Sequence, residues 1–423
     1  MSKPYIALLG KAVRKIAQMR GGGSALPGLF VEKIDPSFIK RTLSELPQGI
    51  VVVSGTNGKT TTTKMVVELL QSQGLKVFTN RTGSNFTRGV AAALLGEIDN
   101  HGNLDADIAV LELDEAHAVH FVKTIAPRYS LLLNVMRDQL DRFGEIDATA
   151  KLLTHIALAT TETVVLNRED PRVAAIAKVL NNQKVSYFGL APTLTALFPN
   201  DDDMRSGSKK VGSTLVADVV LKSLKDHTAD FQLDDHIVSA TLELSGVYNI
   251  YNAAAALALV RTIVKNDLDE TKLLDALSKV TPAFGRGETI TIGGQPLELV
   301  LVKNPSGFRL SLSSFKPDGV ATMIAINDNY ADGRDMSWLW DVDFDSLQPG
   351  GVLEVSGVRA YDMALRLQYD EVEVSHVSID LAEGLQQFIT DASTMPKRIF
   401  CTYTAMLSLR RELAKMTDVE TIS

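Results

Sequence analysis

The sequence predicts an α/β protein with a parallel sheet covered by helices on both faces, followed by a smaller α/β unit. Three observations support this prediction. Short runs rich in Val, Ile and Leu alternate with helical stretches, one such run leads through a glycine-rich turn into a helix, and the alternation resumes after a polar interruption. This order is typical of strands joined by crossover helices, which produce parallel sheets.

The composition allows a large buried core and argues against several classes of protein. Of 423 residues, 45% are hydrophobic and 22% charged, which is ordinary for a globular protein. The net charge of -8 provides no general attraction for nucleic acid, so we expect no nucleic-acid partner. A single cysteine, Cys401, excludes a disulfide framework and fits a reducing cytoplasm. We find no apolar run near the roughly 18 residues of a membrane span.

Residues 1–45 are expected to form a helix and a lead-in segment. Ile6, Leu9, Val13 and Ile16 fall at helical spacing. We favour a helix docked on the body of the protein. The alternative is that its basic side chains touch anionic lipid. Because Lys11 interrupts the apolar run, we expect no signal peptide.

Residues 46–288 are expected to form the central domain, with strands and helices in alternation. Strand-like runs lie at 49–55, 76–80, 107–113, 129–135 and 162–167. Helical stretches lie at 60–73, 87–96, 115–125 and 148–159. The pattern weakens at 190–214, where polar and turn-forming residues predict a loop, and an alanine-rich helix follows at 249–265.

Residues 289–423 are expected to form the smaller C-terminal domain. The chain turns at 281–288, in the stretch TPAFGRGE, which sets the boundary. Beyond it, strand-like runs lie at 298–302, 321–328, 351–357 and 398–403. We find no internal repeat.

The stretch SGTNGKTT, residues 54–61, is predicted to bind phosphate. It lies where strand, turn and helix should meet, so backbone N–H groups and the positive helix end would face phosphate oxygens. Lys59 would reach the terminal phosphates, and the Thr60 hydroxyl would bind Mg²⁺. The first glycine of the usual pattern is replaced by Val53, but Gly55 can support a shorter loop. A plain strand-to-helix turn is the structural alternative.

The form of this loop resembles that of the Mur ligase superfamily, and further stretches resemble its motifs in the same order. LELDEA supplies Glu112 at a strand end, where a carboxylate suits Mg²⁺. The other stretches supply Asn134, Asp138, Gln139, Leu140 and Asp141; Asn167 and Asp170; Gly246, Asn249 and Asn252; and Arg286 and Glu288. Each motif alone is more often a helix cap or solvated surface. Their shared order favours the superfamily.

The resemblance implies an ATP-dependent ligase that converts a carboxylate into an acyl phosphate, which an amine then attacks. It assigns ATP contacts to Gly55, Thr56, Asn57, Gly58, Lys59, Thr60, Thr61, Asn249, Asn252 and Arg286. It assigns Mg²⁺ to Thr60 and Glu112, and catalytic charge neutralisation to Lys59 and Arg286. Individual contacts of Asn134, Asp138 and Asn167 stay open, as does carbamylation of a lysine.

Two departures from the superfamily pattern narrow the choice. Gln139 and Tyr248 stand where many relatives have His. About 45 residues precede the phosphate loop, too few for the separate domain that holds the UDP part of a soluble precursor. We therefore expect a substrate that is not gripped through a uridine nucleotide in that way.

The C-terminal part resembles the MurT family, the ligase subunits of lipid II isoglutaminyl synthase. The similar stretches are VKNPSGF, INDNYADGRDMSWLWDVDF, VSGVRAYDMALRL and FCTYTAML, together with GGGSALPGLF near the start. The resemblance implies amidation of the α-carboxyl of D-glutamate in the lipid II stem peptide. It also implies a heterodimer with a GatD-type glutamine amidotransferase that supplies ammonia. This chemistry would take place in the cytoplasm, at the inner face of the membrane.

Residues 328–345 carry six aspartates and both tryptophans. A solvated loop pinned by Trp338 and Trp340 is the simple interpretation. Given the resemblance, we favour a partner-facing catalytic role, with Asp335 first and Asp332 second.

We expect no zinc site. Many MurT proteins carry a four-cysteine zinc ribbon in the middle domain, but residues 188–240 contain no cysteine, and His227 and His236 alone make a poor structural site. His117 and His120 are interpreted as ordinary helix residues, and Cys401 as structural.

Two rival functions remain open. One is a folylpolyglutamate-type ligase that joins glutamate to a soluble acid, against which the Asp- and Trp-rich segment argues. The other is a non-catalytic ATP-binding scaffold for cell-wall enzymes, against which Lys59, Thr60 and Glu112 argue.

Overall fold

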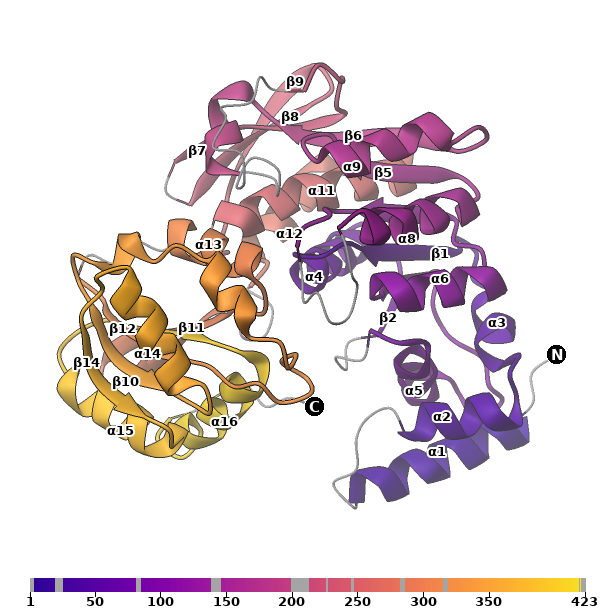
Figure 1. Ribbon diagram of the computed structural model, residues 1–423. Helices are drawn as coiled ribbons and strands as arrows, with labels where there is room; N and C mark the ends of the chain where they lie inside the picture. Colours follow the sequence, from indigo (N-terminus) through magenta and orange to yellow (C-terminus); the bar gives the residue numbers. More distant parts are fainter. Residues whose placement is uncertain are drawn as a thin grey trace. The chain divides into compact units, whose positions relative to one another are not determined.

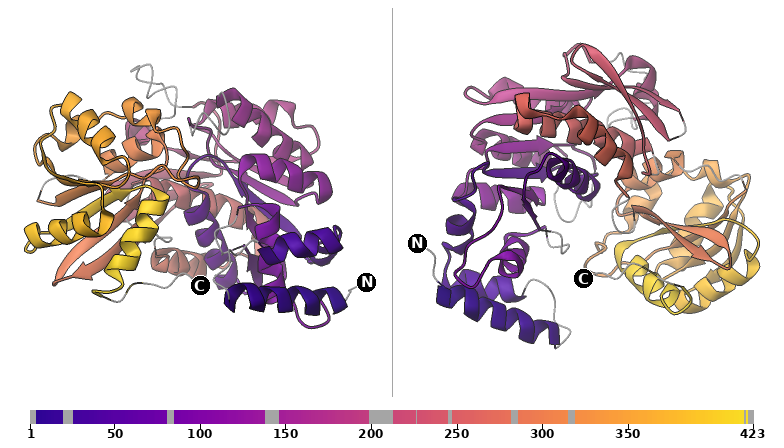
Figure 2. Two further views of the ribbon diagram at one scale, coloured as in Figure 1. Left: turned by 60° about the horizontal axis from the view of Figure 1, so that its bottom comes forward. Right: turned by 180° about the vertical axis from the view of Figure 1, so that it is seen from behind.

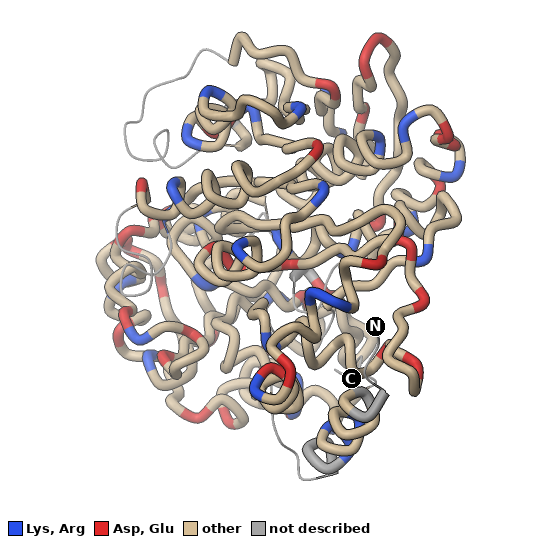
Figure 3. Tube along the Cα trace, turned by 90° about the vertical axis from the view of Figure 1, so that its right-hand side faces the viewer, with Lys and Arg blue, Asp and Glu red and all other residues tan. Residues whose placement is uncertain are grey.

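The computed structural model describes residues 4–19, 26–80, 85–137, 146–198, 213–225, 227–244, 247–281, 286–314, 319–417 and 419. The chain folds into two compact units (Figure 1). The first consists of Met1–Val135, Asp147–Glu243 and Asn249–Val280, and the second of Met136–Ile146, Leu244–Tyr248 and Thr281–Ser423. The expected boundaries at 45/46 and 288/289 stay predictions. Acidic and basic positions are interspersed along the trace in Figure 3.

The first unit is built on a nine-stranded sheet of order β2-β3-β1-β4-β5-β6-β7-β8-β9. Its strands are β1 (Ile50–Ser54), β2 (Val77–Thr79), β3 (Ile108–Glu112), β4 (Tyr129–Leu132), β5 (Thr163–Asn167), β6 (Lys184–Leu190), β7 (Val219–Lys225), β8 (Thr228–Leu233) and β9 (His236–Thr241). The pairs from β2 to β7 are parallel. Helices lie on both faces of the sheet (Figures 1 and 2), which confirms the predicted fold class.

The helices of this unit follow the predicted alternation. They are α1 (Pro4–Met19), α2 (Leu26–Ile34), α3 (Phe38–Leu43), α4 (Lys59–Ser72), α5 (Thr87–Glu97), α6 (Glu115–Thr124), α8 (Ile146–Ala159), α9 (Pro171–Ala175), α11 (Val247–Val264) and α12 (Glu270–Lys279), with short 3₁₀ turns at Ile176–Val179, Pro192–Leu197 and Lys265–Asp267. Strands β1, β3, β4 and β5 are buried at every position. Their continuous apolar runs are typical of strands covered on both faces.

The last three strands differ from the sequence-based expectation. β7, β8 and β9 pair antiparallel with one another, within residues 215–248, for which the sequence predicted no strand. Their alternating burial, as in β8 and β9, is the pattern of strands with one solvated face. Most of the predicted polar loop at 199–214 lies outside the described residues.

Helix α11 is the alanine-rich helix, and it is buried over most of its length. Twelve of its residues are buried, as expected for a helix enclosed within a protein core. Together with the following turn, Val247–Asp267 is the one described segment long and apolar enough to span a membrane, and 61% of its most apolar window is buried. Burial in the fold accounts for this apolar composition.

Helix α1 packs against α2 and α5, as the docked-helix interpretation expects. Its inward side includes Ile6, which is 3% exposed, and Gly10, where a Cβ would lie 2.5 Å from Leu95. Leu9, which the spacing placed with Ile6, is instead 46% exposed. The close approach at Gly10 places Leu9 toward the outer side.

The second unit contains a six-stranded sheet of order β10-β11-β15-β12-β13-β14. Its strands are β10 (Arg286–Ile292), β11 (Gln295–Leu301), β12 (Ala321–Ala325), β13 (Val352–Ser356), β14 (Val374–Ser378) and β15 (Lys397–Cys401). Only β10 pairs antiparallel, with β11. Its helices are α13 (Pro305–Ser314), α14 (Ala360–Tyr369), α15 (Leu381–Asp391) and α16 (Tyr403–Leu413), with 3₁₀ turns at Ser337–Asp341 and Asp345–Leu347.

Two details of this unit differ from the sequence-based prediction. β10 begins at Arg286, inside the stretch that was predicted to be a turn, because residues 286–292 pair with β11 in a hairpin that contains a bulge. β14 was not predicted. Its sequence VSHVS is short and partly polar, so it lacks the apolar run that identified its neighbours.

An ion-pair cluster ties the amino end of β4 and the end of α11 to the amino end of β5. Glu162 accepts hydrogen bonds from Arg128 Nε at 2.7 Å and from Lys265 Nζ at 2.6 Å. Partial burial opposes ionisation of Glu162, but the bonds from Lys265 and Arg128 outweigh it and lower its pKa to about 2. The cluster therefore stabilises the fold through the ionised carboxylate.

We predict that Glu162→Gln lowers the free energy of unfolding by about 1 kcal/mol at neutral pH. Because the folded-state pKa lies below the ordinary 4.5, this contribution is present above pH 4.5 and is lost as the pH falls toward 2. Urea unfolding at several pH values measures it, with exposed Glu97→Gln as control. A wild-type-to-variant difference that does not shrink on acidification would contradict the assignment.

Candidate functional site

The loop after β1 has the backbone shape of a phosphate-binding loop. Gly55 has φ +134° and Gly58 has φ +87°, a region that favours glycine. At Gly58 a Cβ would lie 2.8 Å from the amide of Asn252, so the close packing also requires glycine. Helix α4 begins at Lys59. Its first N–H groups therefore follow directly from the loop, as an anion site needs.

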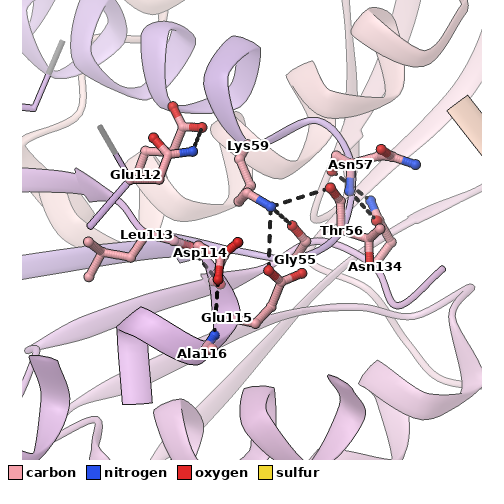
Figure 4. Close-up of polar contacts among 12 residues, drawn as sticks. Gly55, Thr56, Asn57, Lys59, Glu112, Leu113, Asp114, Glu115, Ala116 and Asn134 are labelled. Atoms are coloured by element: carbon pink, nitrogen blue, oxygen red, sulfur yellow. Dashed lines mark hydrogen bonds and ion pairs between the residues drawn. The ribbon is translucent and has the colours of Figure 1, made fainter. Parts of the chain in front are cut away.

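Lys59 lies under this loop rather than in solvent. It is 6% exposed, and its Nζ donates to the carbonyl oxygen of Gly55 at 2.5 Å and of Thr56 at 3.3 Å. Glu115 Oε2 lies 3.6 Å from the same nitrogen (Figure 4). The ammonium is thus held within reach of the loop, and Glu115 balances its charge.

Thr60 and Glu112, the two predicted Mg²⁺ ligands, lie in contact. The Thr60 hydroxyl donates to Glu112 Oε1 at 2.8 Å. A hydroxyl and a carboxylate side by side supply the hard oxygen ligands that Mg²⁺ prefers. The pair lies at the carboxyl edge of the sheet, because Glu112 ends β3 and Thr60 belongs to the first turn of α4.

Two asparagines that we did not assign from the sequence hold Glu112 in place. Asn80 accepts a hydrogen bond from the Glu112 N–H at 2.9 Å and donates to its carbonyl at 2.8 Å. Asn85 donates to Glu112 Oε1 at 2.8 Å. A signal was available for Asn80, which directly follows strand β2 and so falls on the same sheet edge as Glu112.

Asn134 fixes the other side of the loop. Its Oδ1 accepts from the Asn57 N–H at 2.8 Å, and its Nδ2 donates to the Asn57 carbonyl at 2.9 Å. The Asn134 carbonyl also accepts from the Thr56 N–H at 3.0 Å. Asn134 therefore holds the backbone of the loop at Thr56 and Asn57 (Figure 4). The sequence had left this role open.

The motif residues of β5 and α11 form a buried polar layer nearby. Tyr251 donates to Asn167 Oδ1 at 2.6 Å, and Asn167 donates to the Leu133 carbonyl at 2.8 Å. Asp170 accepts from the N–H groups of Val135, Arg172 and Val173, and its burial raises its pKa to about 6. These groups anchor the segment after β4 to the start of α9.

The remaining residues predicted to contact the nucleotide lie beside the loop, are enclosed by the fold, or fall outside the described residues. Asn252 is 9% exposed and lies against Gly58, and Asn249 stands one turn earlier on α11. Thr61 is 1% exposed, so its side chain is enclosed by the fold. Asp138, Gln139, Leu140, Asp141, Gly246 and the side chain of Arg286 lie outside the described residues.

In the second unit, Asp332 is bound into the fold. It is 2% exposed, and its carboxylate accepts from the Thr404 N–H at 2.7 Å and from the Thr404 hydroxyl at 2.5 Å. Burial raises its pKa, while the Thr404 bonds oppose that effect. Asp332 therefore joins the segment after β12 to the start of α16.

Asp335 is half-buried and is held more lightly. It accepts from the Ser337 N–H at 2.9 Å, and hydrogen bonds from Ser337 lower its pKa. Its carboxylate is therefore ionised at neutral pH. Of the two predicted aspartates, Asp335 has the more accessible side chain.

The histidines, the acidic group and the cysteine considered as metal ligands or nucleophiles lie as follows. His117 packs edge-on against Phe86 at 4.2 Å, and His120 is exposed on the same helix. His236 lies 2.8 Å from Glu270. Among the described residues, Asp343, Asp345 and Asp370 form the one acidic group spaced closely enough for a cation. Cys401 is fully buried, which raises the pKa of its thiol.

Comparison with known proteins finds a separate match for each of the two parts of the chain. The sequence matches a model of the Mur ligase middle domain over residues 53–260 and of the MurT ligase C-terminal domain over residues 301–406. It is 32% identical to the lipid II isoglutaminyl synthase (glutamine-hydrolyzing) subunit MurT of Streptococcus pneumoniae, over 96% of each chain. It is 28% identical to the corresponding subunit of Staphylococcus aureus, over 86% of this chain and 87% of that one.

Solved structures agree in fold. The MurF ligase of Thermotoga maritima in complex with ADP aligns with a TM-score of 0.67 at 19% identity, covering 90% of this chain and 84% of that chain. The geometry of the phosphate loop and the sequence matches in both units indicate the same family. The chain belongs to the Mur ligase family, and its C-terminal part is a MurT ligase C-terminal domain.

Proposed function

We propose that this protein is the ligase subunit of a lipid II isoglutaminyl synthase. It would use ATP to amidate the α-carboxyl of D-glutamate in the lipid II stem peptide, giving D-isoglutamine for peptidoglycan. The observation that carries this proposal is the pneumococcal relative, which is matched over 96% of both chains. The C-terminal match to MurT ligases favours this substrate over the folylpolyglutamate alternative.

The first unit would bind ATP and Mg²⁺. The loop from Gly55 to Thr60 fits a phosphate chain, because its positive-φ glycines and the start of α4 present backbone donors. Thr60 and Glu112 would hold Mg²⁺, which neutralises phosphate charge when bound. Lys59, and Arg286 from the motif resemblance, would balance the charge that develops on the transferred phosphoryl group.

Amide formation needs both an activated acid and an uncharged amine. A carboxylate is a poor electrophile, so its oxygen would first take the γ-phosphoryl group to form an acyl phosphate. Ammonia would then attack the carbonyl carbon, and phosphate would leave. Because ammonium predominates at neutral pH, a supply of ammonia to a shielded site favours the second step.

A GatD-type glutamine amidotransferase subunit would supply this ammonia in a heterodimer. The printed name of the relative, a glutamine-hydrolysing synthase subunit, supports such a partner. The sole cysteine is fully buried, so it is unsuited to act as a glutaminase nucleophile. Asp335 would serve the partner, by orienting its catalytic His or receiving ammonia, with Asp332 as the second candidate.

The proposed substrate places the reaction at the inner face of the cell membrane. Lipid II is membrane-linked, so a cytoplasmic enzyme must approach the bilayer surface. On α1, Leu8 and Leu9 are 53% and 46% exposed, and Lys15 is also exposed. Exposed leucines and an exposed basic side chain on one helix support peripheral membrane contact.

We predict that Thr60→Val raises the Mg²⁺ concentration for half-maximal ATP turnover about tenfold, the effect of losing roughly 1.4 kcal/mol of interaction. Valine keeps the shape of threonine but cannot ligate a cation or donate to Glu112. Thr60→Ser should restore the wild-type requirement. An unchanged Mg²⁺ dependence in Thr60→Val would rule out this hydroxyl as a ligand.

The proposed function is tested with purified protein, ATP, Mg²⁺ and lipid II, with the product followed by mass spectrometry. Ammonium should support amidation by the chain alone, and glutamine should support it only when the co-expressed amidotransferase is present. Absence of amidated lipid II under every condition, with ATP still bound, would contradict the proposal and favour another substrate or the scaffold alternative.

In the same assay, Asp335→Asn should lower glutamine-driven amidation at least about 100-fold, the usual scale for a group that assists proton transfer. If Asp335 orients the partner's catalytic His, ammonium-driven amidation should persist, because the ATP site is unchanged; if Asp335 receives ammonia, ammonium-driven amidation should fall as well. Glu383→Gln, an exposed change in the same unit, is the matched control. Wild-type glutamine-driven activity in a folded Asp335→Asn complex would disprove the role.

A further inference from the structure

Helix α14 presents an apolar stripe to solvent. Tyr361, Leu365 and Tyr369 recur at every fourth position, so they share one face of the helix. They are 66%, 48% and 70% exposed, and Val358, just before the helix, is 57% exposed. Trp340 is 49% exposed and packs edge-on against Tyr369, with ring centroids 5.2 Å apart. We call these five residues the α14 face.

The stripe is not required by the fold of the helix, because α14 docks through a different set of residues. Ala360, Met363 and Leu367 are fully buried in the core of the second unit. A helix with one buried face and a second, exposed apolar face is typical of a protein that binds a partner. Tyr and Trp are also the residues most enriched at the energetic centres of interfaces.

Trp340 is held in position before any partner binds. The Arg366 guanidinium lies 5.5 Å from the Trp340 ring centroid, and it donates to the Val342 carbonyl and to Asp370. The side chain therefore needs little ordering on binding, which lowers the entropic cost of an interface.

Acidic side chains surround the Trp340 end of the face. Asp341, Asp343 and Asp345 are exposed, and carboxylate oxygens of Asp343, Asp345 and Asp370 lie within 4.8 Å of one another. Asp341 is paired with Arg137 at 3.7 Å and Asp370 with Arg366, so the rim's repulsion lies between Asp343 and Asp345. Repulsion from Asp343 raises the pKa of Asp345. A basic surface brought against this rim would relieve that repulsion.

We propose that the α14 face is the docking surface for the glutamine-hydrolysing subunit, which would cover it with an apolar pocket bordered by Lys or Arg. This inference rests on the proposed function. The face lies wholly within residues 301–406, the part matched to MurT ligases. Trp340 belongs to the 3₁₀ turn Ser337–Asp341, and Asp335 accepts from the first N–H of that turn, so the α14 face and Asp335 share one short element.

Charge argues against two other occupants. An anionic membrane would be repelled by the acidic rim. A second copy of this chain would bring an equally acidic rim against the first, which is unfavourable for like charges. A basic partner subunit satisfies both the apolar stripe and its rim.

The test measures binding of the purified amidotransferase subunit from the same organism to the wild-type chain and to Tyr361→Ala/Leu365→Ala/Tyr369→Ala. We expect the Kd to rise at least about tenfold in the triple variant, because truncated interface anchors each cost 1 kcal/mol or more. A matched control, Leu197→Ala/Val216→Ala/Ile237→Ala, removes exposed apolar side chains of the first unit and should bind normally.

Association kinetics test the rim separately. Asp343→Asn/Asp345→Asn should slow association at low salt, and the difference from wild type should shrink as salt is added. Both sets of substitutions lie on exposed residues, so melting temperatures should stay close to that of the wild type.

The outcomes separate this inference from the proposed function. Ammonium-driven amidation that persists in the triple variant while glutamine-driven amidation is lost supports docking at the α14 face. An unchanged Kd in a folded triple variant overturns it and leaves the proposed function standing. A wild-type chain that self-associates through this face also overturns it, as light scattering would show. Failure of amidation with every nitrogen source overturns the proposed function instead.

Discussion

The position of β1 between β3 and β4 is the constraint on which the candidate site depends. Parallel pairing sets Val53 opposite Glu112 and Ser54 opposite Leu132, so three strands end at one edge of the sheet. The glycine loop, the Thr60–Glu112 pair and Asn134, which holds the loop, all lie at that edge. No single motif residue creates the site. A change of register in one strand would separate groups that now lie within hydrogen-bonding distance.

Much of this arrangement could be predicted because buried parallel strands and phosphate loops have strong local signals. The run IVVVS and the following Gly-Lys-Thr indicated β1, the loop and α4, and LELDEA indicated Glu112. Asn85 was missed because its partner Glu112 is distant in sequence, and Asn80 was missed although its position directly after β2 offered a signal. Strands β7–β9 were missed because alternating, half-exposed strands carry weaker patterns than buried ones. Leu9 was placed inward by spacing alone, whereas packing at Gly10 decided which side of α1 is buried.

The two units contribute different chemistry to the account. The first holds the donors suited to phosphate and a divalent cation. The second carries two aspartates with different settings: Asp332 is fixed to Thr404 and supports the fold, whereas Asp335 is accessible and ionised. Its α14 face adds an exposed aromatic surface beside the same segment. The accessible Asp335 and the α14 face therefore both lie in the second unit.

The central claim is that the protein activates a carboxylate by phosphorylation, and oxygen transfer tests it most directly. Lipid II labelled with ¹⁸O in the α-carboxyl of D-glutamate would be amidated with ATP and ammonium, and the released phosphate analysed by mass spectrometry. An acyl phosphate requires one labelled oxygen to leave with each phosphate, and that is the predicted result. Amide formation with unlabelled phosphate would contradict the account.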